Sequence, residues 1–358
     1  MPIKRTRRSG TVAAALLLGA AATSGCGLLG AAAEGDGGGG GAGDHPFTVA
    51  FGGDVHFEGM ISTRLQSAPD TVFGPIAAEF RKADLAMVNL ETAITEGGTP
   101  APKDYTFRAP PAAFQALRTA GLDVVTMANN HGMDYGEAGL QDSLAASGRA
   151  GFPVVGIGRN AAEAYRPWTT TVKGTKIAVI GATQVLDDNL IESWTATDAK
   201  AGVASAKNAP RLVQAVQRAR KEAHVVIVNL HWGQERNSCA TPAQRQLAGQ
   251  LADAGADAIV GSHAHVLQAG GYLKGKYVHY GLGNFVFYNG SGPTAQSGVL
   301  TLTFDPKVKD TRVTKASWAP AVVTDGVPQP LAGASAQQAR TQWEGLRNCA
   351  DVKAGPAA

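Results

Sequence analysis

Short apolar runs of this chain are repeatedly followed, within a few residues, by side chains that can bind a metal ion or transfer a proton. In chain order these side chains are Asp54, His56, Glu91, Asn130, His131, His231, His263 and His265. Short apolar runs rich in Val, Ile and Ala are typical of buried strands. Because open α/β sheets place their sites at the carboxyl ends of strands, we expect these side chains to lie close together.

The spacing of apolar residues predicts an α/β fold. Strands are expected at 48–52, 85–89, 124–127, 154–156, 176–180, 225–229, 258–260, 277–280, 284–287, 298–304 and 312–320. Amphipathic helices are expected at 74–82, 112–120, 136–147, 209–222, 242–253 and 336–346. Helices become rare in the last third of the chain. This order favours a four-layer sandwich of two packed mixed β-sheets flanked by helices over a barrel.

The N-terminus has the composition of an export signal. Basic residues within 4–8 precede an apolar segment at 11–22, which is too short to span a bilayer comfortably. Small residues then precede Cys26, as in lipoprotein signals. We therefore expect a signal peptide at 1–25 and a lipidated Cys26 that anchors an extracytoplasmic protein to the cell membrane. An uncleaved N-terminal anchor is the alternative, and it leaves the protein on the same side.

The remainder of the chain shows one composition regime. The glycine-rich segment 26–45 is expected to be a flexible tether. Residues 46–350 are expected to form one domain, near the size at which single cores stop growing. Residues 351–358 are expected to be a disordered tail.

The charge balance gives no indication of nucleic-acid binding. The full chain carries 32 basic and 29 acidic side chains, but four of the basic ones lie within 1–25. The exported chain is therefore close to neutral, with none of the basic excess typical of nucleic-acid-binding domains.

Two cysteines besides Cys26 are present, Cys239 and Cys349. An even pair in a chain predicted to reach an oxidising compartment favours a disulfide bond. Such a bond would hold the helical segment 336–346 against the loop that follows His231. The alternative is two unrelated buried thiols.

The donor set favours a pair of divalent ions. In the triplets at 54–56 and 263–265 the outer residues of an extended strand project to the same side. Two neighbouring cations need a shared anionic ligand, for which Asp54 and Glu91 are the candidates. Nitrogen and oxygen donors without cysteine suit Mn, Fe, Zn or Mg. Asp54 and Asn130 could instead cap helices, and Glu91 could form a cap or a salt bridge.

Together these motifs resemble the calcineurin-like metallophosphoesterase superfamily. Within it, the phrases Ala-Asn-Asn-His-Gly-Met-Asp at 128–134, Asn-Leu-His-Trp-Gly at 229–233 and Tyr-Gly-Leu-Gly-Asn-Phe-Val at 280–286 resemble the CapA family of poly-γ-glutamate capsule synthesis proteins. The similarity extends over about residues 47–305. The chain departs from the superfamily at Glu91, where an aspartate is usual.

The resemblance implies a role for each site residue. Asp54, His56 and His265 would hold one metal, and Asn130, His231 and His263 the other, with Glu91 bridging. His131 would act as general acid, and Asp134 would orient it and raise its pKa.

Two functions follow from the resemblance. The first is an exported, membrane-tethered metal-dependent hydrolase of the phosphoesterase type, acting on a phosphoester or an anionic polymer in capsule synthesis beside a membrane-bound polymer synthase. The second is a non-catalytic polymer assembly, export or anchoring factor that retains the metal site. ATP-driven ligation is excluded for this chain alone, because the segment 270–277 departs from a phosphate-binding loop and is expected to be a hairpin turn. Lys103, Arg108, Arg64 and Arg236 are candidates for guiding an acidic polymer.

Overall fold

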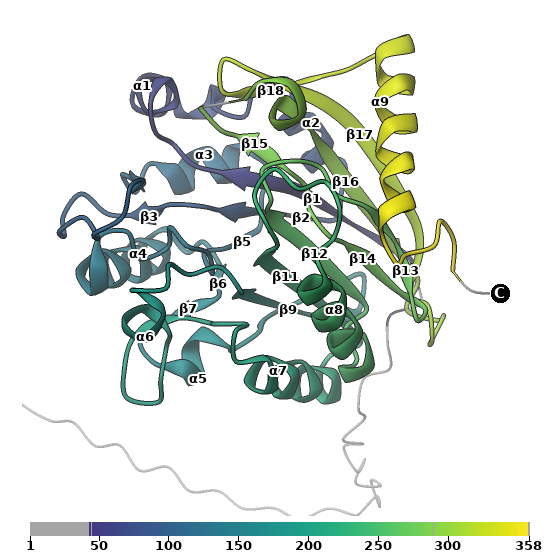
Figure 1. The fold of residues 1–358 in the computed structure, drawn as a ribbon, viewed down its shortest axis with the longest axis horizontal. Coiled ribbons are helices and arrows are strands. Elements are labelled where there is room, and N and C mark those ends of the chain that lie inside the picture. The colour runs from purple at the N-terminus through teal and green to yellow at the C-terminus, as the bar shows by residue number, and fades with distance from the viewer. Residues whose placement is uncertain (1–42, 44, 289, 357–358) are drawn as a thin grey trace, which may run out of the picture. The chain divides into compact units, whose positions relative to one another are not determined.

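The computed structural model describes residues 43, 45–288 and 290–356, and two β-sheets form the centre of this part (Figure 1). The strands of the larger sheet are β1 (Phe47–Val55), β2 (Leu85–Leu90), β5 (Val124–Thr126), β6 (Val154–Val155), β15 (Asn284–Val286), β16 (Gln296–Phe304), β17 (Val313–Thr324) and β18 (Val327–Pro330). Their order is β18-β17-β16-β1-β2-β5-β6, and β15 pairs with the carboxyl end of β1.

The smaller sheet has six strands. These are β8 (Trp168–Val172), β9 (Thr175–Thr183), β11 (Val225–Trp232), β12 (Ala258–His263), β13 (Gly270–Leu273) and β14 (Lys276–His279). Their order is β13-β14-β12-β11-β9-β8. Two short pairs lie outside both sheets: β3 (Ala93–Ile94) with β4 (Arg108–Ala109), and β7 (Ile157–Gly158) with β10 (Gly202–Val203).

Helices connect the strands. The α-helices are α1 (Met60–Ser67), α2 (Ala77–Arg81), α3 (Ala113–Ala120), α4 (Gly136–Ala150), α5 (Ala161–Ala164), α6 (Ile191–Trp194), α7 (Ala209–Glu222), α8 (Pro242–Ala254) and α9 (Gly333–Gly345). The 3₁₀ helices are η1 (Pro69–Thr71), η2 (Gly74–Ile76), η3 (Gly292–Ala295) and η4 (Leu346–Cys349). Among the described residues, no helix is both long enough and apolar enough to cross a bilayer.

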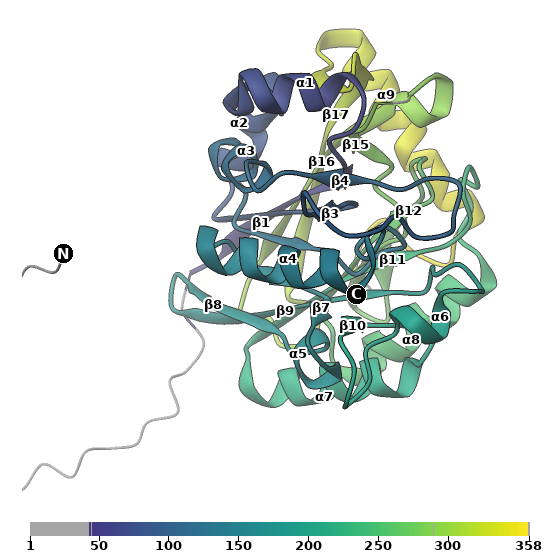
Figure 2. The same cartoon turned by 90° about the vertical axis from the view of Figure 1, so that its left-hand side faces the viewer.

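Alternation along the strands produces three hydrophobic layers. Phe51 of β1 packs with Val179 of β9 and Ile227 of β11 in the cluster between the sheets. Its neighbour Ala50 points the other way and belongs to the cluster shared with α2, α3 and α4. On the far side, Val226 packs with residues of α7 and α8, and these two helices lie together beside the smaller sheet (Figures 1 and 2). Successive strand residues face opposite sides, so the two sheets and their helices form the expected four-layer α/β sandwich.

Parallel pairing places the strand ends that carry the candidate ligands at one edge of each sheet. In the larger sheet β1, β2 and β5 run parallel, with Asp54 in register with Asn89. In the smaller sheet β9, β11 and β12 run parallel, with His231 in register with Ser262. The donors that follow these strands therefore leave the sheets at their carboxyl ends.

A glycine close to the end of β1 allows a tight approach. A β-carbon on Gly53 would lie 1.9 Å from the carbonyl oxygen of Gly283, so only glycine fits. This close approach accompanies the hydrogen bond from the amide of Asp54 to that carbonyl at 2.9 Å. The pairing register of β1 and β2 shifts at this point, which re-aims Asp54.

The segment that resembles a phosphate-binding loop is a hairpin, as predicted. β13 and β14 pair antiparallel, and their turn places Lys274 and Gly275 at φ values of 51° and 75°. Positive φ at both central residues is typical of the tight turns that join hairpin strands.

The predicted strands are present, but the sequence missed several elements. These are the helices α1, α5 and α6 and the strands β3, β4, β7, β8, β10, β13 and β18. Helix α1 and strand β8 have weak apolar periodicity, and β8 is only partly buried. Propensity alone does not identify such segments.

The prediction of a disordered tail at 351–358 is wrong for residues 351–353. Lys353 and Tyr272 exchange backbone hydrogen bonds of 2.7 and 2.9 Å, and Val352 is buried. The Tyr280 hydroxyl donates to the Asp351 carboxylate at 2.5 Å. Residues 351–353 are thus attached to the edge of the smaller sheet. The signal peptide, Cys26 and nearly all of the tether lie outside the described residues.

The predicted disulfide is confirmed. Cys239 and Cys349 are bonded, with their α-carbons 5.4 Å apart. The bond joins the loop after β11 to η4, at the end of the C-terminal helix.

Candidate metal centre

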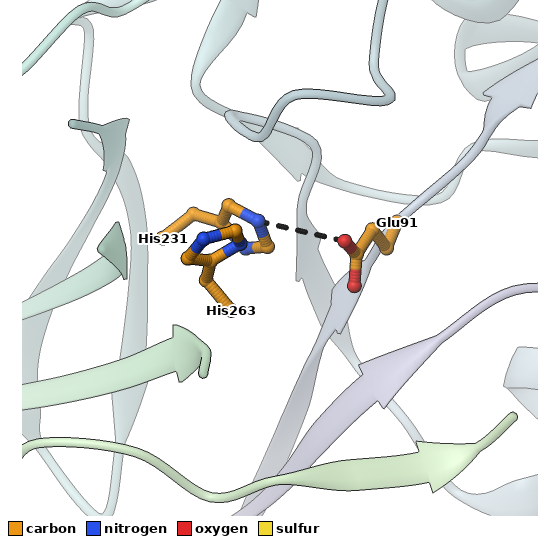
Figure 3. Close-up of side chains that lie close together, drawn as sticks. All are labelled: Glu91, His231 and His263. Atoms are coloured by element: carbon orange, nitrogen blue, oxygen red, sulfur yellow. Dashed lines mark ion pairs between the residues drawn. The ribbon is translucent and has the colours of Figure 1, made fainter. Parts of the chain in front are cut away.

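Glu91 lies at the centre of the converging side chains. It follows β2, it is fully buried, and neither of its carboxylate oxygens has a hydrogen-bond partner. One oxygen lies 3.5 Å from Nε2 of His231, and His231 and His263 both face it in Figure 3. A buried carboxylate without partners is costly unless a cation or proton joins it.

Two groups of potential ligands share Glu91. Its carboxylate lies with His231 and His263 in one group, and with Asp54 and His265 in the other, with ligand atoms within 4.8 Å of one another in each group. This sharing is what a bridging carboxylate requires. Five of the seven predicted ligands therefore converge.

The sixth predicted ligand, Asn130, joins the His231 side. Its side-chain oxygen lies 2.7 Å from Nε2 of His231. The other ring nitrogen of His231 lies 3.1 Å from both the Asn89 amide and the Ser262 hydroxyl. These contacts fix the orientation of the His231 ring.

The Asp54 side is held by backbone and side-chain contacts. The amide of His263 donates to Asp54 Oδ2 at 3.1 Å, and Nδ1 of His265 lies 3.5 Å from the same oxygen. The side-chain oxygen of Asn284 lies 2.9 Å from that ring nitrogen and supports the orientation of the His265 ring. His263 and His265 have φ values of 91° and 54°. Strain of this kind is characteristic of functional sites.

His56 is the predicted ligand that the structure does not bring into these groups. The amides of Glu58 and Tyr288 lie 3.0 and 3.3 Å from its two ring nitrogens. Its ring packs against Phe107 and Phe287, with centroids 4.7 and 4.1 Å apart. A metal role for His56 would require one ring nitrogen to give up a backbone contact, and it stays a prediction.

The predicted proton-transfer pair is formed. Nδ1 of His131 lies 2.6 Å from Asp134 Oδ2, and its Nε2 lies 3.9 Å from Glu91. The amide of Phe107 donates to the same Asp134 oxygen at 2.6 Å, and the Phe107 ring stacks on His131 with centroids 4.1 Å apart. Lys103 pairs with the other oxygen of Asp134 at 3.1 Å. The imidazole is therefore aimed from Asp134 toward the ligand cluster.

The pKa of His131 is lowered in this structure, although Asp134 was expected to raise it. Burial, followed by the ammonium group of Lys103, holds the pKa of His131 well below its ordinary value. Burial also raises the pKa of Asp134 to about 7, so its carboxylate is only partly charged near neutrality. The contact is present, but burial outweighs it.

The electrostatics of the cluster favour a cation. Burial, followed by the Asp54 carboxylate, raises the pKa of Glu91 well above its ordinary value. Burial lowers the pKa of His263 to about 3 and that of His231 well below its usual range. Burial also opposes the charge of His265, but the Glu91 and Asp54 carboxylates outweigh it and raise its pKa to about 9. The raised pKa of His265 shows that the buried carboxylates favour a positive charge beside them, and the neutral imidazoles of His231 and His263 are suitable ligands for divalent transition metals.

Sequence reasoning missed four contributors. Asn89 donates to Asp54 at 2.8 Å, Asn129 donates to Asn89 at 3.0 Å, Lys103 supports Asp134, and Glu235 groups with His263 and His265. Asn89 and Asn129 stand next to predicted ligands, which is the signal that could have identified them. Glu235 follows the His-Trp-Gly phrase by two residues, but nothing in its spacing assigns it.

The four basic residues considered for polymer guidance do not form one group. Lys103 is buried between Asp134 and Asp187. Arg108 lies over the Tyr135 ring at 4.9 Å, and Arg64 belongs to α1. Of the four, Arg236 lines a pocket beside His265.

Comparison with known proteins places the chain in a family. The model of the family described as "Bacterial capsule synthesis protein PGA_cap" matches residues 48–289. A PGA biosynthesis protein CapA of Bacillus subtilis is 31% identical over 72% of this chain and 67% of its own length. A capsule biosynthesis protein CapA of Bacillus anthracis is 30% identical over 74% of this chain and 64% of its own length.

More distant similarities were also found. A probable polyglutamine synthesis accessory protein of Mycobacterium tuberculosis is 31% identical over 58% of this chain and 57% of its own length. A calcineurin-like phosphoesterase structure from Bacillus subtilis aligns with a TM-score of 0.48 and 16% identity, over 84% of this chain and 99% of that chain. On the family match and the CapA identity, this chain belongs to the bacterial capsule synthesis protein PGA_cap family.

Proposed function

We propose that this protein is an accessory factor of poly-γ-glutamate capsule synthesis with a dinuclear metal centre that hydrolyses a phosphoester or related bond. Family membership and the similarity to the capsule biosynthesis proteins of Bacillus support the capsule role. The chain spans about two thirds of the length of those relatives, so their whole activity is not assumed for it. The donor set at the strand ends supports the hydrolytic centre.

One observation carries the metal proposal. Both oxygens of Glu91 are buried without a partner, and both candidate ligand groups include that carboxylate. In the proposed centre, Asp54 and His265 hold one ion, His231 and His263 hold the other with Asn130 beside them, and Glu91 is shared. When bound, two such ions supply the Lewis acidity that phosphoryl transfer to water requires.

The residues around the centre would orient and protonate the substrate. His131 faces the cluster through Nε2, while Asp134 fixes Nδ1 on the opposite side of the ring. A proton held on Nε2 would be available to the leaving oxygen of a substrate seated between His131 and Glu91. The Phe107 ring stacks on one face of this imidazole and holds its plane in place.

The second candidate is a non-catalytic assembly or export factor that binds metal and polymer. The lowered pKa of His131 favours this alternative, because a neutral imidazole carries one proton, and the tautomer with that proton on Nδ1 beside Asp134 has none to give from Nε2. The replacement of the usual aspartate by Glu91 favours it as well.

Metal content and turnover, measured on the same variants, distinguish the two. The purified full chain would be loaded with Mn²⁺, and hydrolysis of p-nitrophenyl phosphate and bis-p-nitrophenyl phosphate would be followed. We expect His131→Ala to retain the metal and to lose about 100-fold or more of the rate, as for loss of a general acid. Two bound ions without wild-type turnover would establish the assembly role, and a chain that binds no Mn²⁺ would contradict both.

The proposed location is extracytoplasmic, with a lipid on Cys26 anchoring the protein beside a membrane-bound polymer synthase. The basic, apolar and small-residue segments before Cys26 support this proposal. Cys26→Ser should release the protein from the membrane fraction and abolish incorporation of labelled fatty acid. Equal labelling of the variant and the wild type would contradict lipidation at this residue.

A further inference from the structure

Glu235 provides an exposed carboxylate at the mouth of the buried centre. It lies in the loop after β11, and its ligand atom lies within 4.8 Å of those of His263 and His265. Glu91 and Asp54 are fully buried, whereas the His265 side chain is 18% exposed. Glu235 is thus the most exposed residue of these candidate ligand groups, and it shares its two histidines with the buried carboxylates.

The backbone next to Glu235 is held in a costly conformation. Arg236 has a φ of 59°, which non-glycine residues rarely adopt, and its amide donates to the carbonyl of Ala264 at 2.8 Å. Ala264 lies between His263 and His265, which are themselves at positive φ. One hydrogen bond therefore joins the Glu235 loop to the histidine loop, and strain of this kind persists only where the surroundings impose it.

Further contacts hold the loop. The side-chain amide of Gln268 donates to the carbonyls of Asn237 and Cys239 at 2.8 and 3.3 Å. The disulfide from Cys239 to Cys349 fixes the same segment to η4. Glu235 therefore stands on an anchored loop, and its position relative to the histidines is set by the fold.

A pocket of about 380 Å³ opens at this point. Glu235 and His265 line it, together with Arg236, Asn284 and Tyr288. An ion that reaches the buried carboxylates from this pocket passes the exposed carboxylate first.

Both histidines of the outer group also belong to the inner groups. His263 is also grouped with Glu91 and His231, and His265 with Asp54 and Glu91. A ring nitrogen binds one cation at a time, so a cation on Glu235, His263 and His265 competes with the inner centre wherever both use the same nitrogen of a histidine.

We propose that Glu235, His263 and His265 form an entry position that captures a divalent cation and passes it to the buried centre. This inference rests on the proposed dinuclear centre. A ligand on the path speeds both entry and exit without changing the final affinity. Glu235 therefore controls the rate at which the centre exchanges metal.

The test is a stopped-flow measurement of Mn²⁺ association with the metal-free full chain, read through quenching of tryptophan fluorescence. Trp232 follows His231 in β11 and provides a buried reporter. We expect Glu235→Gln to slow association and dissociation by about tenfold, within the range of electrostatic and capture effects. The Mn²⁺ stoichiometry and dissociation constant should remain within about twofold of wild type, and Glu235→Asp should recover part of the rate.

Two controls separate capture from general electrostatics. Asp104→Asn removes an exposed carboxylate from the neighbouring pocket that shares Tyr288, and Glu344→Gln removes one from α9. Both should leave the association rate unchanged. A rate loss in Asp104→Asn equal to that of Glu235→Gln would overturn the capture role in favour of a field effect.

The remaining outcomes are also decisive. An unchanged rate in Glu235→Gln, with normal binding, overturns the entry position and leaves the proposed function intact. A loss of stoichiometry at equilibrium makes Glu235 a permanent ligand and likewise overturns the entry role. If the wild type binds no Mn²⁺, and its Mn²⁺ binding therefore equals that of Glu91→Gln, both this inference and the proposed centre fail.

Discussion

At the scale of single residues, the site destabilises the metal-free protein, and a bound cation would remove this destabilisation. Glu91 is buried with two unpartnered oxygens, and Nδ1 of His263 is also buried without a partner. Such groups destabilise a metal-free protein, because burial removes their hydration and nothing in the protein replaces it. Function and stability are therefore opposed at this position.

Replacing Glu91 should make this opposition measurable. Glu91→Gln removes a buried carboxylate whose pKa is raised by burial and by Asp54. We expect the free energy of unfolding of the metal-free variant to be about 1 to 3 kcal/mol larger than that of the metal-free wild type at pH 7. The variant should also lose the stabilisation that Mn²⁺ gives to wild type. Urea unfolding in EDTA and in Mn²⁺ measures both effects. A metal-free variant less stable than wild type would show that the Glu91 carboxylate has a protein partner.

At the scale of elements, loops rather than strands hold the outer part of the site. The strands place Asp54 and His231 by register. The loop after β11 depends instead on the amide of Arg236, the side chain of Gln268 and the disulfide. Loops anchored in this way commonly carry functional residues on a rigid scaffold.

The disulfide should contribute strongly to stability. It closes a loop with a sequence separation of 110 residues. In the chain-entropy model a loop of this length is worth about 4 to 5 kcal/mol, and measured values are about 2 to 5 kcal/mol. The double variant Cys239→Ser, Cys349→Ser should therefore lose about that free energy of unfolding in urea. Wild-type protein unfolded in dithiothreitol should match the variant; a reduced wild type as stable as the oxidised one would contradict the estimate.

At the scale of the whole molecule, the two sheets and the C-terminal helix are joined by a stack of rings. His279 of β14 lies 6.2 Å from Trp318 of β17 and 5.9 Å from Trp343 of α9, measured between ring centroids. The indole of Trp343 donates to Nε2 of His279 at 3.0 Å. Aromatic stacking of this kind adds to the area buried between layers.

This stack should make stability depend on pH. Burial lowers the pKa of His279 from 6.5 to about 3. Below pH 6.5 the unfolded chain binds a proton that the folded chain does not, so stability falls as pH decreases toward 3. One such group contributes about 1.4 kcal/mol per pH unit in this window. His279→Gln should reduce the slope of unfolding free energy against pH by that amount. Parallel curves for variant and wild type would show that His279 takes up its proton while folded.

The sequence alone determined the α/β class, the strand ends that carry donors and the residues around Glu91. It could do so because apolar periodicity identifies strands locally, and parallel pairing then brings their carboxyl ends to one edge. The disulfide was also predictable, since an even pair of cysteines in a chain expected to be exported favours a bond.

Only the tertiary structure decided how each side chain is used. His56 and His265 occupy equivalent places in their triplets, yet the ring of His56 packs among aromatic rings while that of His265 faces Asp54. The low pKa of His131, the hydrogen bond from Asn89 to Asp54 and the approach of Glu235 depend on residues far away in the chain. Desolvation and contact between distant segments are properties of the packed molecule, and no local pattern in the sequence records them.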